Sequence, residues 1–395
     1  SAFAPDNILC YVLGLLNTPI VQLVLLAINP TLNYQVGNIS EVPVIIPESH
    51  EKIDEIVKEN IKLAKDDWDS FETSWGFKKH PLLKFNVNTL KSAFIDWNKY
   101  KDEEFSKLQS NEIDLNNIFI DIYQLQDDIS SDVQDNYISL NRANLFEDVK
   151  SFISYAVGCM FGRYSIDSEG LIFAGGQWDS SKYLKFRPDD DNIIPILDTE
   201  FFEDDIVGRF VEFVKVTFGE ANLEENLDFI AKALKKKRST SREVIRNYLL
   251  TDFYKDHVKT YKKCPIYWLF DSGKNNGFKA LIYMHRYETD LLARMRTDYL
   301  HKTQKAIENA IANNERIIEN STSASEKSQA VKARDKLVKQ LEETKKYDAA
   351  LAHLANQKIE IDLDDGVKVN YTKFQGVEVS TEGKKPTKIN LLKEI

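Results

Sequence analysis

A long polar segment between residues 288 and 355 constrains the fold more than any other part of the chain. Residues 288–319 carry a helical pattern, a Ser/Thr/Ala break follows at 321–325, and a second helical pattern continues to about Ala355. Two long helices joined by a short break are typical of an antiparallel helical hairpin. Glycine (15) and proline (10) are scarce among the 395 residues, which favours long helices over a turn-rich sandwich or barrel. The sequence therefore predicts a mainly α chain.

Helical spacing of apolar residues recurs in most of the chain before this segment. It is found over residues 50–110, 140–163, 204–218, 223–236 and 241–262. Four aromatic residues follow the first apolar stripe, and we expect them to be core residues: Trp68, Phe71, Trp75 and Phe77. The length of the chain is sufficient for roughly two or three packed domains.

Small β elements are predicted at three places. Residues 42–46 form a short apolar run that is typical of a strand. Residues 264–270 and 278–283 are two apolar runs separated by a turn, which predicts a hairpin-like insertion. Near the end of the chain, residues 359–363 and 367–371 alternate in polarity around a turn at 364–366, which predicts a closing β-hairpin.

The apolar run over residues 8–28 could be mistaken for a signal peptide or a membrane span. No Lys or Arg occurs before Lys52, whereas a signal sequence needs a basic start. The run is also broken at Asn17, where Thr18 can cap a new helix that begins at Pro19. Two short helices are therefore expected, without a membrane contact. The three scattered cysteines, Cys10, Cys159 and Cys264, fit a reducing, cytoplasmic compartment better than a disulfide framework.

No catalytic residue, cofactor-binding residue or metal ligand is predicted in this chain. The glycines at 174–176 lack the spacing of a nucleotide-binding loop, and the six histidines show no paired metal-ligand spacing. The aspartates at 189–191 and at 362–365 are interpreted as solvated loops, since the further carboxylates of a magnesium or calcium site are not identifiable.

Basic residues gather in one region of a chain whose net charge is -10. They are opposed locally by Glu243, Asp252 and Asp256 and comprise Lys232, Lys235, Lys236, Lys237, Arg238, Arg242, Arg246, Lys255, Lys259, Lys262 and Lys263. Such a cluster can follow a phosphate backbone although the average charge is acidic. It can equally be a solvated helix face, and the residues alone leave both interpretations open.

Several motifs resemble a known family. The segment at 29–39, Asn-Pro-Thr-Leu-Asn-Tyr-Gln-Val-Gly-Asn-Ile, resembles the one that closes the target-recognition domain of large adenine-specific DNA methyltransferases, with Asn38 where an aspartate is common. Its first three residues lack the second proline and the aromatic residue of a catalytic Asn-Pro-Pro-aromatic loop. The segments at 65–75, 155–164, 264–270 and 283–287 are similar to the C-terminal region of the PglX family, the methyltransferases of the BREX phage-resistance system.

The resemblance implies methyl transfer from S-adenosylmethionine to the N6 of adenine in double-stranded DNA, with the catalytic and cofactor-binding domain upstream of this chain. It also implies that residues 1–47 end a mixed α/β target-recognition domain. Residues 48–285 would form a helical C-terminal domain with small β insertions, 286–357 a long helical hairpin and 358–395 a β-hairpin tail. The chain would contact DNA and other BREX proteins.

Two groups of residues are the candidate DNA contacts. The first offers amide, hydroxyl and aromatic groups for base edges or sugar-phosphate: Asn29, Thr31, Asn33, Tyr34 and Gln35. The second would supply non-specific attraction: Lys235, Lys236, Lys237, Arg238, Arg242 and Arg246. Locally, the first group can instead cap turns, with Tyr34 in the core. The alternative function is a helical scaffold that docks other defence-system subunits without contacting DNA.

Overall fold

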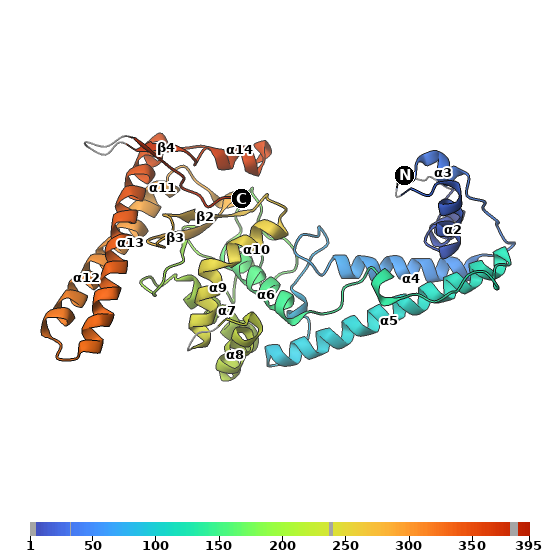
Figure 1. Ribbon diagram of the computed structural model, residues 1–395, viewed down its shortest axis with the longest axis horizontal. Coiled ribbons are helices and arrows are strands. Elements are labelled where there is room, and N and C mark those ends of the chain that lie inside the picture. The colour runs from blue at the N-terminus through green and yellow to red at the C-terminus, as the bar shows by residue number, and fades with distance from the viewer. Residues whose placement is uncertain (1–4, 32, 237–239, 380–385) are drawn as a thin grey trace. The chain divides into compact units, whose positions relative to one another are not determined.

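The computed structural model describes residues 5–31, 33–236, 240–379 and 386–395 (Figure 1). Helices dominate and the strands form two small sheets, which confirms the predicted mainly α class. The chain divides into two compact units. Unit 1 consists of Ser1–Gly76 with Phe94–Asn144, and unit 2 of Phe77–Ala93 with Leu145–Ile395.

Unit 1 is built from helices, four of which pack around the larger of its two apolar clusters. Its helices are α1 (Asp6–Leu16), α2 (Pro19–Ile28), α3 (Val36–Ser40), α4 (Glu51–Trp68), α5 (Leu90–Tyr123, from Phe94 onward in this unit) and the short 3₁₀ helix η2 (Asp135–Tyr137). Tyr11, Val57 and Phe119 bring α1, α4 and α5 together in this cluster. The predicted break at Thr18 is confirmed, because α2 starts at Pro19 and the Thr18 hydroxyl donates to the Leu15 carbonyl at 2.7 Å.

No single helix among the described residues is long and apolar enough to cross a membrane. The pair Asn7–Leu16 and Pro19–Ile28, bent by 69°, meets the length and composition criteria only when both helices are taken together.

The prediction that the four aromatic residues after the first apolar stripe belong to the core is wrong for three of them. Trp68, Phe71 and Trp75 are 60%, 42% and 104% exposed, and only Phe77 is buried. Helical spacing no longer applies there, because α4 ends at Trp68 and residues 69–76 form turns. The inward position at the end of α4 is taken by Asp67, whose carboxylate pairs with the buried Lys101 ammonium of α5.

The strand predicted at residues 42–46 is also absent. The segment begins with a bend at Val42, and no described strand pairs with it. Instead the Tyr123 hydroxyl donates to the Pro43 carbonyl at 2.7 Å and accepts from the Ile45 backbone N–H at 3.2 Å. A short apolar run becomes a strand only where another strand can satisfy its backbone groups.

Unit 2 combines a helical layer with a three-stranded antiparallel sheet. The helices are α6 (Leu145–Met160), α7 (Ile206–Phe218), α8 (Leu223–Leu234), α9 (Ser241–Thr251) and α10 (Phe253–Thr260), together with the 3₁₀ helices η1 (Pro81–Leu83), η3 (Ser180–Lys182), η4 (Glu220–Asn222) and η5 (Met284–Arg286). The sheet order is β1 (Ile194–Pro195), β3 (Lys279–Tyr283), β2 (Tyr267–Asp271). Leu269 faces Leu281 across β2 and β3, which confirms the predicted hairpin.

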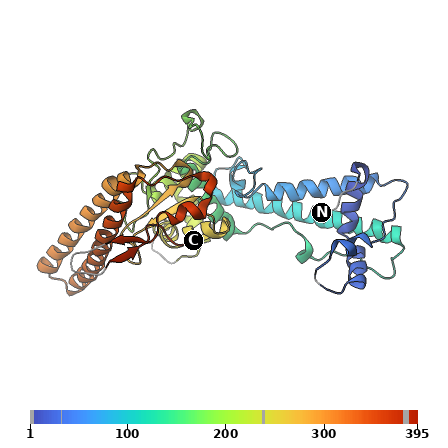
Figure 2. The ribbon, with the colours of Figure 1, turned by 90° about the horizontal axis from the view of Figure 1, so that it is seen from above.

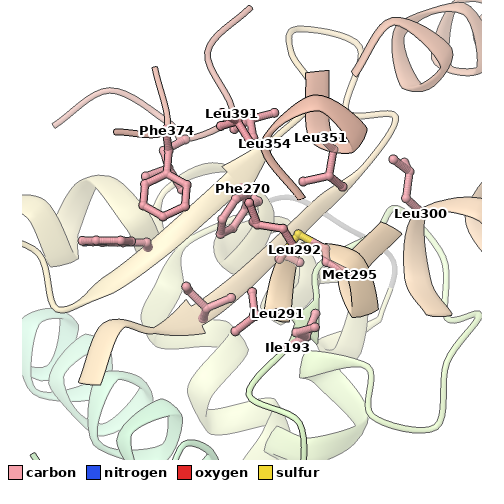
Figure 3. Packing of buried hydrophobic residues seen from close by; sticks show 14 of the residues in the cluster. Ile193, Phe270, Leu291, Leu292, Met295, Leu300, Leu351, Leu354, Phe374 and Leu391 are labelled. Carbon is pink, nitrogen blue, oxygen red and sulfur yellow. The ribbon is translucent and has the colours of Figure 1, made fainter. Parts of the chain in front are cut away.

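The predicted long helical hairpin is confirmed. It consists of α12 (His301–Asn320) and α13 (Ala324–Gln357), which lie side by side in both views (Figures 1 and 2). Before α12, the chain forms α11 (Leu291–Arg294) and a π-helical turn, η6 (Met295–Leu300). Phe270, Leu292 and Leu351 gather in the buried cluster that joins the sheet to these helices (Figure 3).

The closing β-hairpin does not occupy the predicted residues. Residues 363–372 form the 3₁₀ helix η7 (Leu363–Asp365) and helix α14 (Val367–Thr372), and the hairpin follows at β4 (Val377–Val379) and β5 (Thr387–Ile389). Val367, Tyr371 and Phe374 pack against the core at intervals of four and three, which is helical spacing. The Asn370 side chain also donates to the Gly366 carbonyl at 3.1 Å and stabilises this turn.

Candidate nucleic-acid interface

The loop between α2 and α3 contains the first group of candidate residues, and its internal hydrogen bonds divide them into two sets. The Asn29 carbonyl oxygen Oδ1 accepts from the Thr31 backbone N–H at 3.1 Å and from the Thr31 hydroxyl at 2.8 Å. The Asn29 amide Nδ2 donates to the Asn33 carbonyl at 3.1 Å. Asn29 and Thr31 therefore shape the loop, as in the local interpretation.

Asn38 closes the same loop from the first turn of α3. Its Oδ1 accepts from the Gln35 backbone N–H at 3.0 Å and from the Asn29 Nδ2 at 3.3 Å. An aspartate, which the family resemblance would place here, offers an acceptor oxygen of the same geometry. Asn38 therefore accepts the hydrogen bonds that an aspartate at this position could accept, and the loop conformation does not require the aspartate.

The side chains of Asn33, Tyr34 and Gln35 are exposed. Those of Asn33 and Tyr34 form no hydrogen bond with a described residue, whereas Gln35 is the N-cap of α3 and forms a capping box with Asn38. Tyr34 is 38% exposed, so the alternative that places it in the core is wrong. Of the five candidates in this loop, these three retain polar groups that can contact a ligand. Spacing in the sequence could not distinguish them from Asn29 and Thr31, because the difference lies in the hydrogen bonds that each side chain forms in the folded loop.

The second group of candidates lies in unit 2, and the described arginines in it are engaged in ion pairs. The Arg246 guanidinium donates to both carboxylate oxygens of Asp205 at 2.8 Å and to the Leu197 carbonyl at 3.0 Å. Arg242 makes a two-bond contact with Glu224, at 2.7 and 2.8 Å. Lys237 and Arg238 lie outside the described residues.

Lys235 and Lys236 directly follow helix α8, and only Lys236 is paired. Its ammonium contacts Asp252, the residue between α9 and α10. Burial raises the pKa of Asp252, but hydrogen bonds from Lys236 and Thr251 and the charges of Lys236 and Lys255 outweigh it and leave that pKa below its usual value. Lys236 and Lys255 therefore both favour the ionised form of Asp252.

A set of exposed lysines on α8, on α10 and directly after these helices has no described acidic residue at ion-pair distance. We call them the α8–α10 lysines: Lys232, Lys235, Lys255, Lys259, Lys262 and Lys263. Helix α9 packs against both α8 and α10, so these helices belong to one layer of unit 2. Only Lys235 was among the candidates chosen for DNA contact, because the sequence does not reveal which cations are already neutralised.

Three carboxylates come together elsewhere in unit 2. Asp189, Asp191 and Asp204 each place an oxygen within 4.8 Å of the others, and the Tyr299 hydroxyl lies 2.9 Å from Asp191 and 2.5 Å from Asp204. Burial, followed by the charges of Asp191 and Asp204, raises the pKa of Asp189 to about 7. The interpretation of residues 189–191 as a solvated loop is therefore wrong for Asp189, which is buried.

The chemistry of this carboxylate cluster follows from its spacing. Carboxylate oxygens so close together are ligands of the kind that hard divalent cations take. A proton held between two of them would relieve the repulsion, and the Ile193 backbone N–H donates to Asp189 at 3.1 Å. Asp204 could not be identified from the sequence, since only the packing of α7 brings it to the loop.

The histidines and cysteines form no metal-binding group within the described ranges. Two histidines are fully buried, and burial lowers the pKa of each to about 3. His257 accepts from the backbone N–H groups of Ile266 and Tyr267, at 3.2 and 3.1 Å, and so holds the start of β2. His80 lies 2.9 Å from the Ser151 hydroxyl. Both histidines are therefore assigned a structural role, since each is buried and contacts groups of the fold itself.

No model of a protein family matches the chain. Over 384 residues, 95% of the chain, it is 44% identical to the adenine-specific methyltransferase PglX of Lacticaseibacillus casei (strain Zhang). Over 393 residues, 92% of the chain, it is 37% identical to the adenine-specific methyltransferase BrxX of Escherichia coli O9:H4 (strain HS). The matched part is 32% of each relative, so the chain spans about a third of their length. Over nearly all its residues, therefore, the chain is homologous to part of the adenine-specific methyltransferases PglX and BrxX, which confirms the family suggested by the sequence motifs.

Proposed function

We propose that this chain is the DNA-contacting and assembly region of a BREX-type adenine-N6 methyltransferase. A region outside this chain would hold S-adenosylmethionine and transfer the methyl group to double-stranded DNA. The observation that carries the proposal is the 44% identity to an adenine-specific methyltransferase over 95% of the chain. Since the relatives are about three times as long, a division of labour between this region and the rest is consistent with their length.

The α8–α10 lysines support a contact with the phosphate backbone. Exposed ammonium groups without an acidic partner gain most from DNA, because binding releases counterions from the phosphates without first breaking an ion pair. The net charge of -10 belongs to the whole chain, whereas affinity for DNA depends on the local field. Arg242 and Arg246 would contribute less, as each is already paired with a carboxylate.

The α2–α3 loop supports a contact of a different kind. Asn33 and Gln35 carry amides that can both donate and accept, which suits the edges of bases in the major groove. Tyr34 adds an exposed phenol beside them. Hydrogen bonds that the Oδ1 atoms of Asn29 and Asn38 accept hold the loop in its conformation before binding, so less conformational entropy is lost when a ligand binds.

A salt series with duplex DNA tests the phosphate contact. Fluorescence anisotropy of a labelled duplex would compare the chain with a triple variant at Lys235, Lys259 and Lys263, each changed to Glu. Lys255 is retained because its charge acts on Asp252. We expect the affinity to fall steeply with salt, and the triple variant to reduce the slope of log affinity against log salt by about 0.9 for each phosphate contact removed.

A matched control uses three exposed lysines of α13, Lys332, Lys339 and Lys346, changed to Glu. The change in net charge is the same, but the surface is different. If both triple variants weaken binding equally, the effect is one of net charge and the proposed surface is wrong.

The alternative function, a scaffold without DNA contact, is favoured by one observation. Helix α12 buries only Thr303 and Ile307, and residues 324–339 of α13 bury only Ala330, so most of this part of the hairpin is accessible. Such a hairpin offers a long surface to protein partners. Absence of duplex binding even at low salt would favour this second function over the first.

A further inference from the structure

A groove in unit 1 runs between three helices of the apolar cluster. It has a volume of about 200 Å³ and lies between α1, α4 and α5. Leu13, Val57, Ile61, Leu108 and Leu115 supply apolar walls. Leu13 and Ile61 are 41% and 47% exposed, so the rim of the groove is apolar as well.

Several polar groups that line the groove already have partners within the protein. The Asn17 amide donates to the Leu13 carbonyl at 2.8 Å, and the Asn116 amide donates to the Ser131 carbonyl at 3.1 Å. The Asn60 oxygen accepts from the Asn111 amide at 2.8 Å. These contacts hold the walls in place.

Glu112 of α5 differs from these groups. It lines the groove, and no described residue donates a hydrogen bond to its carboxylate or forms an ion pair with it. Burial among the apolar walls raises its pKa. A partly desolvated carboxylate without a partner is stabilised by any cation that reaches it.

The size and chemistry of the groove select an elongated amphipathic cation. A cavity of about 150 Å³ is sufficient for a benzene-sized apolar ligand, so this groove can hold a chain of about four to six carbons. Lysine has a four-carbon apolar stem that packs against apolar surface while its ammonium remains at a polar group. The ammonium is also a compact charge, whereas the guanidinium of arginine is broad and planar.

We propose that this groove binds a lysine side chain presented by a protein segment. The stem of the lysine lies against Leu13, Ile61 and Leu108, and its ammonium pairs with the Glu112 carboxylate. The charge complementarity between an unpaired carboxylate and an ammonium, in a groove with apolar walls, argues for this occupant. The site is independent of any contact with DNA.

The test uses three short peptides that differ only at the central residue. Acetyl-Ala-Leu-Lys-Leu-Ala-amide is compared with peptides that carry norleucine or glutamate at the centre. Binding to the full chain is measured by titration calorimetry. We expect the lysine peptide to bind about tenfold more tightly than the norleucine peptide, which has the same stem without the charge, and the glutamate peptide to bind more weakly than both.

Variants of the chain assign the effect to Glu112. Glu112→Gln should abolish the preference for lysine and leave the affinity for norleucine unchanged. Glu55→Gln is the matched control, since Glu55 is exposed on α4 and does not line the groove. Circular dichroism establishes that both variants are folded, which we expect because Glu112 is partly desolvated and without a partner, and Glu55 is exposed.

Three outcomes would overturn the proposal: equal affinity for lysine and norleucine, a preference for lysine that survives Glu112→Gln, or no saturable binding of the lysine peptide. Hexylamine supplies the remaining comparison. If this free amine binds more tightly than the lysine peptide, the groove is a site for a small amine and the proposed protein segment is wrong.

Discussion

Arg246 of α9 and Asp205 at the start of α7 form an ion pair in which two guanidinium nitrogens donate to two carboxylate oxygens, each at 2.8 Å. Asp205 is almost fully buried and also caps α7, because it accepts from the Val207 backbone N–H at 3.0 Å. One carboxylate thus begins a helix and joins it to another. Arg246 therefore stabilises the fold by pairing with Asp205, independently of any contact with DNA.

We predict that Arg246→Met lowers the free energy of unfolding by about 3 kcal/mol, because it leaves the Asp205 carboxylate buried without its cation. Urea denaturation measures this change. The control is Arg242→Met, which breaks an exposed pair with Glu224 and should cost less than about 1 kcal/mol. Similar losses in the two variants would contradict the structural role assigned to Arg246.

Glu343 of α13 fixes the turn between β2 and β3. Its carboxylate accepts from the Ser272 hydroxyl at 2.8 Å, from the Asn275 backbone N–H at 2.9 Å and from the Gly277 backbone N–H at 3.1 Å. Glu343→Ala should lower the free energy of unfolding by about 2 kcal/mol or more, since several donors lose their charged acceptor. The neighbouring Glu342 is exposed, so Glu342→Ala should change it by less than about 0.5 kcal/mol. Thermal unfolding of the two variants decides the point.

The stability of unit 2 should depend on pH through Asp189. Its pKa in the folded chain is about 7, against about 3.9 in the unfolded chain. Between these values the folded state binds more protons than the unfolded state, so stability falls as the pH rises from about 4 to about 7. Asp189→Asn should reduce the difference in unfolding free energy between pH 5 and pH 8, measured by urea denaturation. An unchanged difference would mean that the carboxylates do not share a proton.

Asn29 forms hydrogen bonds within the α2–α3 loop and the Asn33 side chain does not, so we predict different effects when each is replaced by alanine. Asn29→Ala should speed hydrogen exchange at the Thr31 amide, because its acceptor Oδ1 is lost. Asn33→Ala removes an exposed side chain that forms no hydrogen bond to a described residue, so exchange in the loop should be unchanged. Exchange followed by mass spectrometry compares the two. Equal effects would show that Asn33 also maintains the loop.

Periodicity in the sequence correctly predicted the elements that are stabilised mainly by residues near them in the chain. The α12–α13 hairpin could be predicted because each helix repeats its pattern over many residues around a clear break. The β2–β3 hairpin could be predicted because its two strands are neighbours in the chain. The strand predicted at residues 367–371 was wrong because polar and apolar residues in so short a segment fit both periods, and contacts with the core select the helix.

The sequence by itself determined the mainly helical class, the break at Thr18 and the family, since these depend on local pattern and on residue identity. Only the tertiary structure decided which charges are available. Lys235 and Lys236 are adjacent and of one type, yet Lys236 is paired with Asp252 while Lys235 is not. Likewise, Asp204 joins Asp189 and Asp191 only through the packing of α7. The strength of a charge depends on its distance to other charges and on its exposure to water, and both are fixed by how the helices pack.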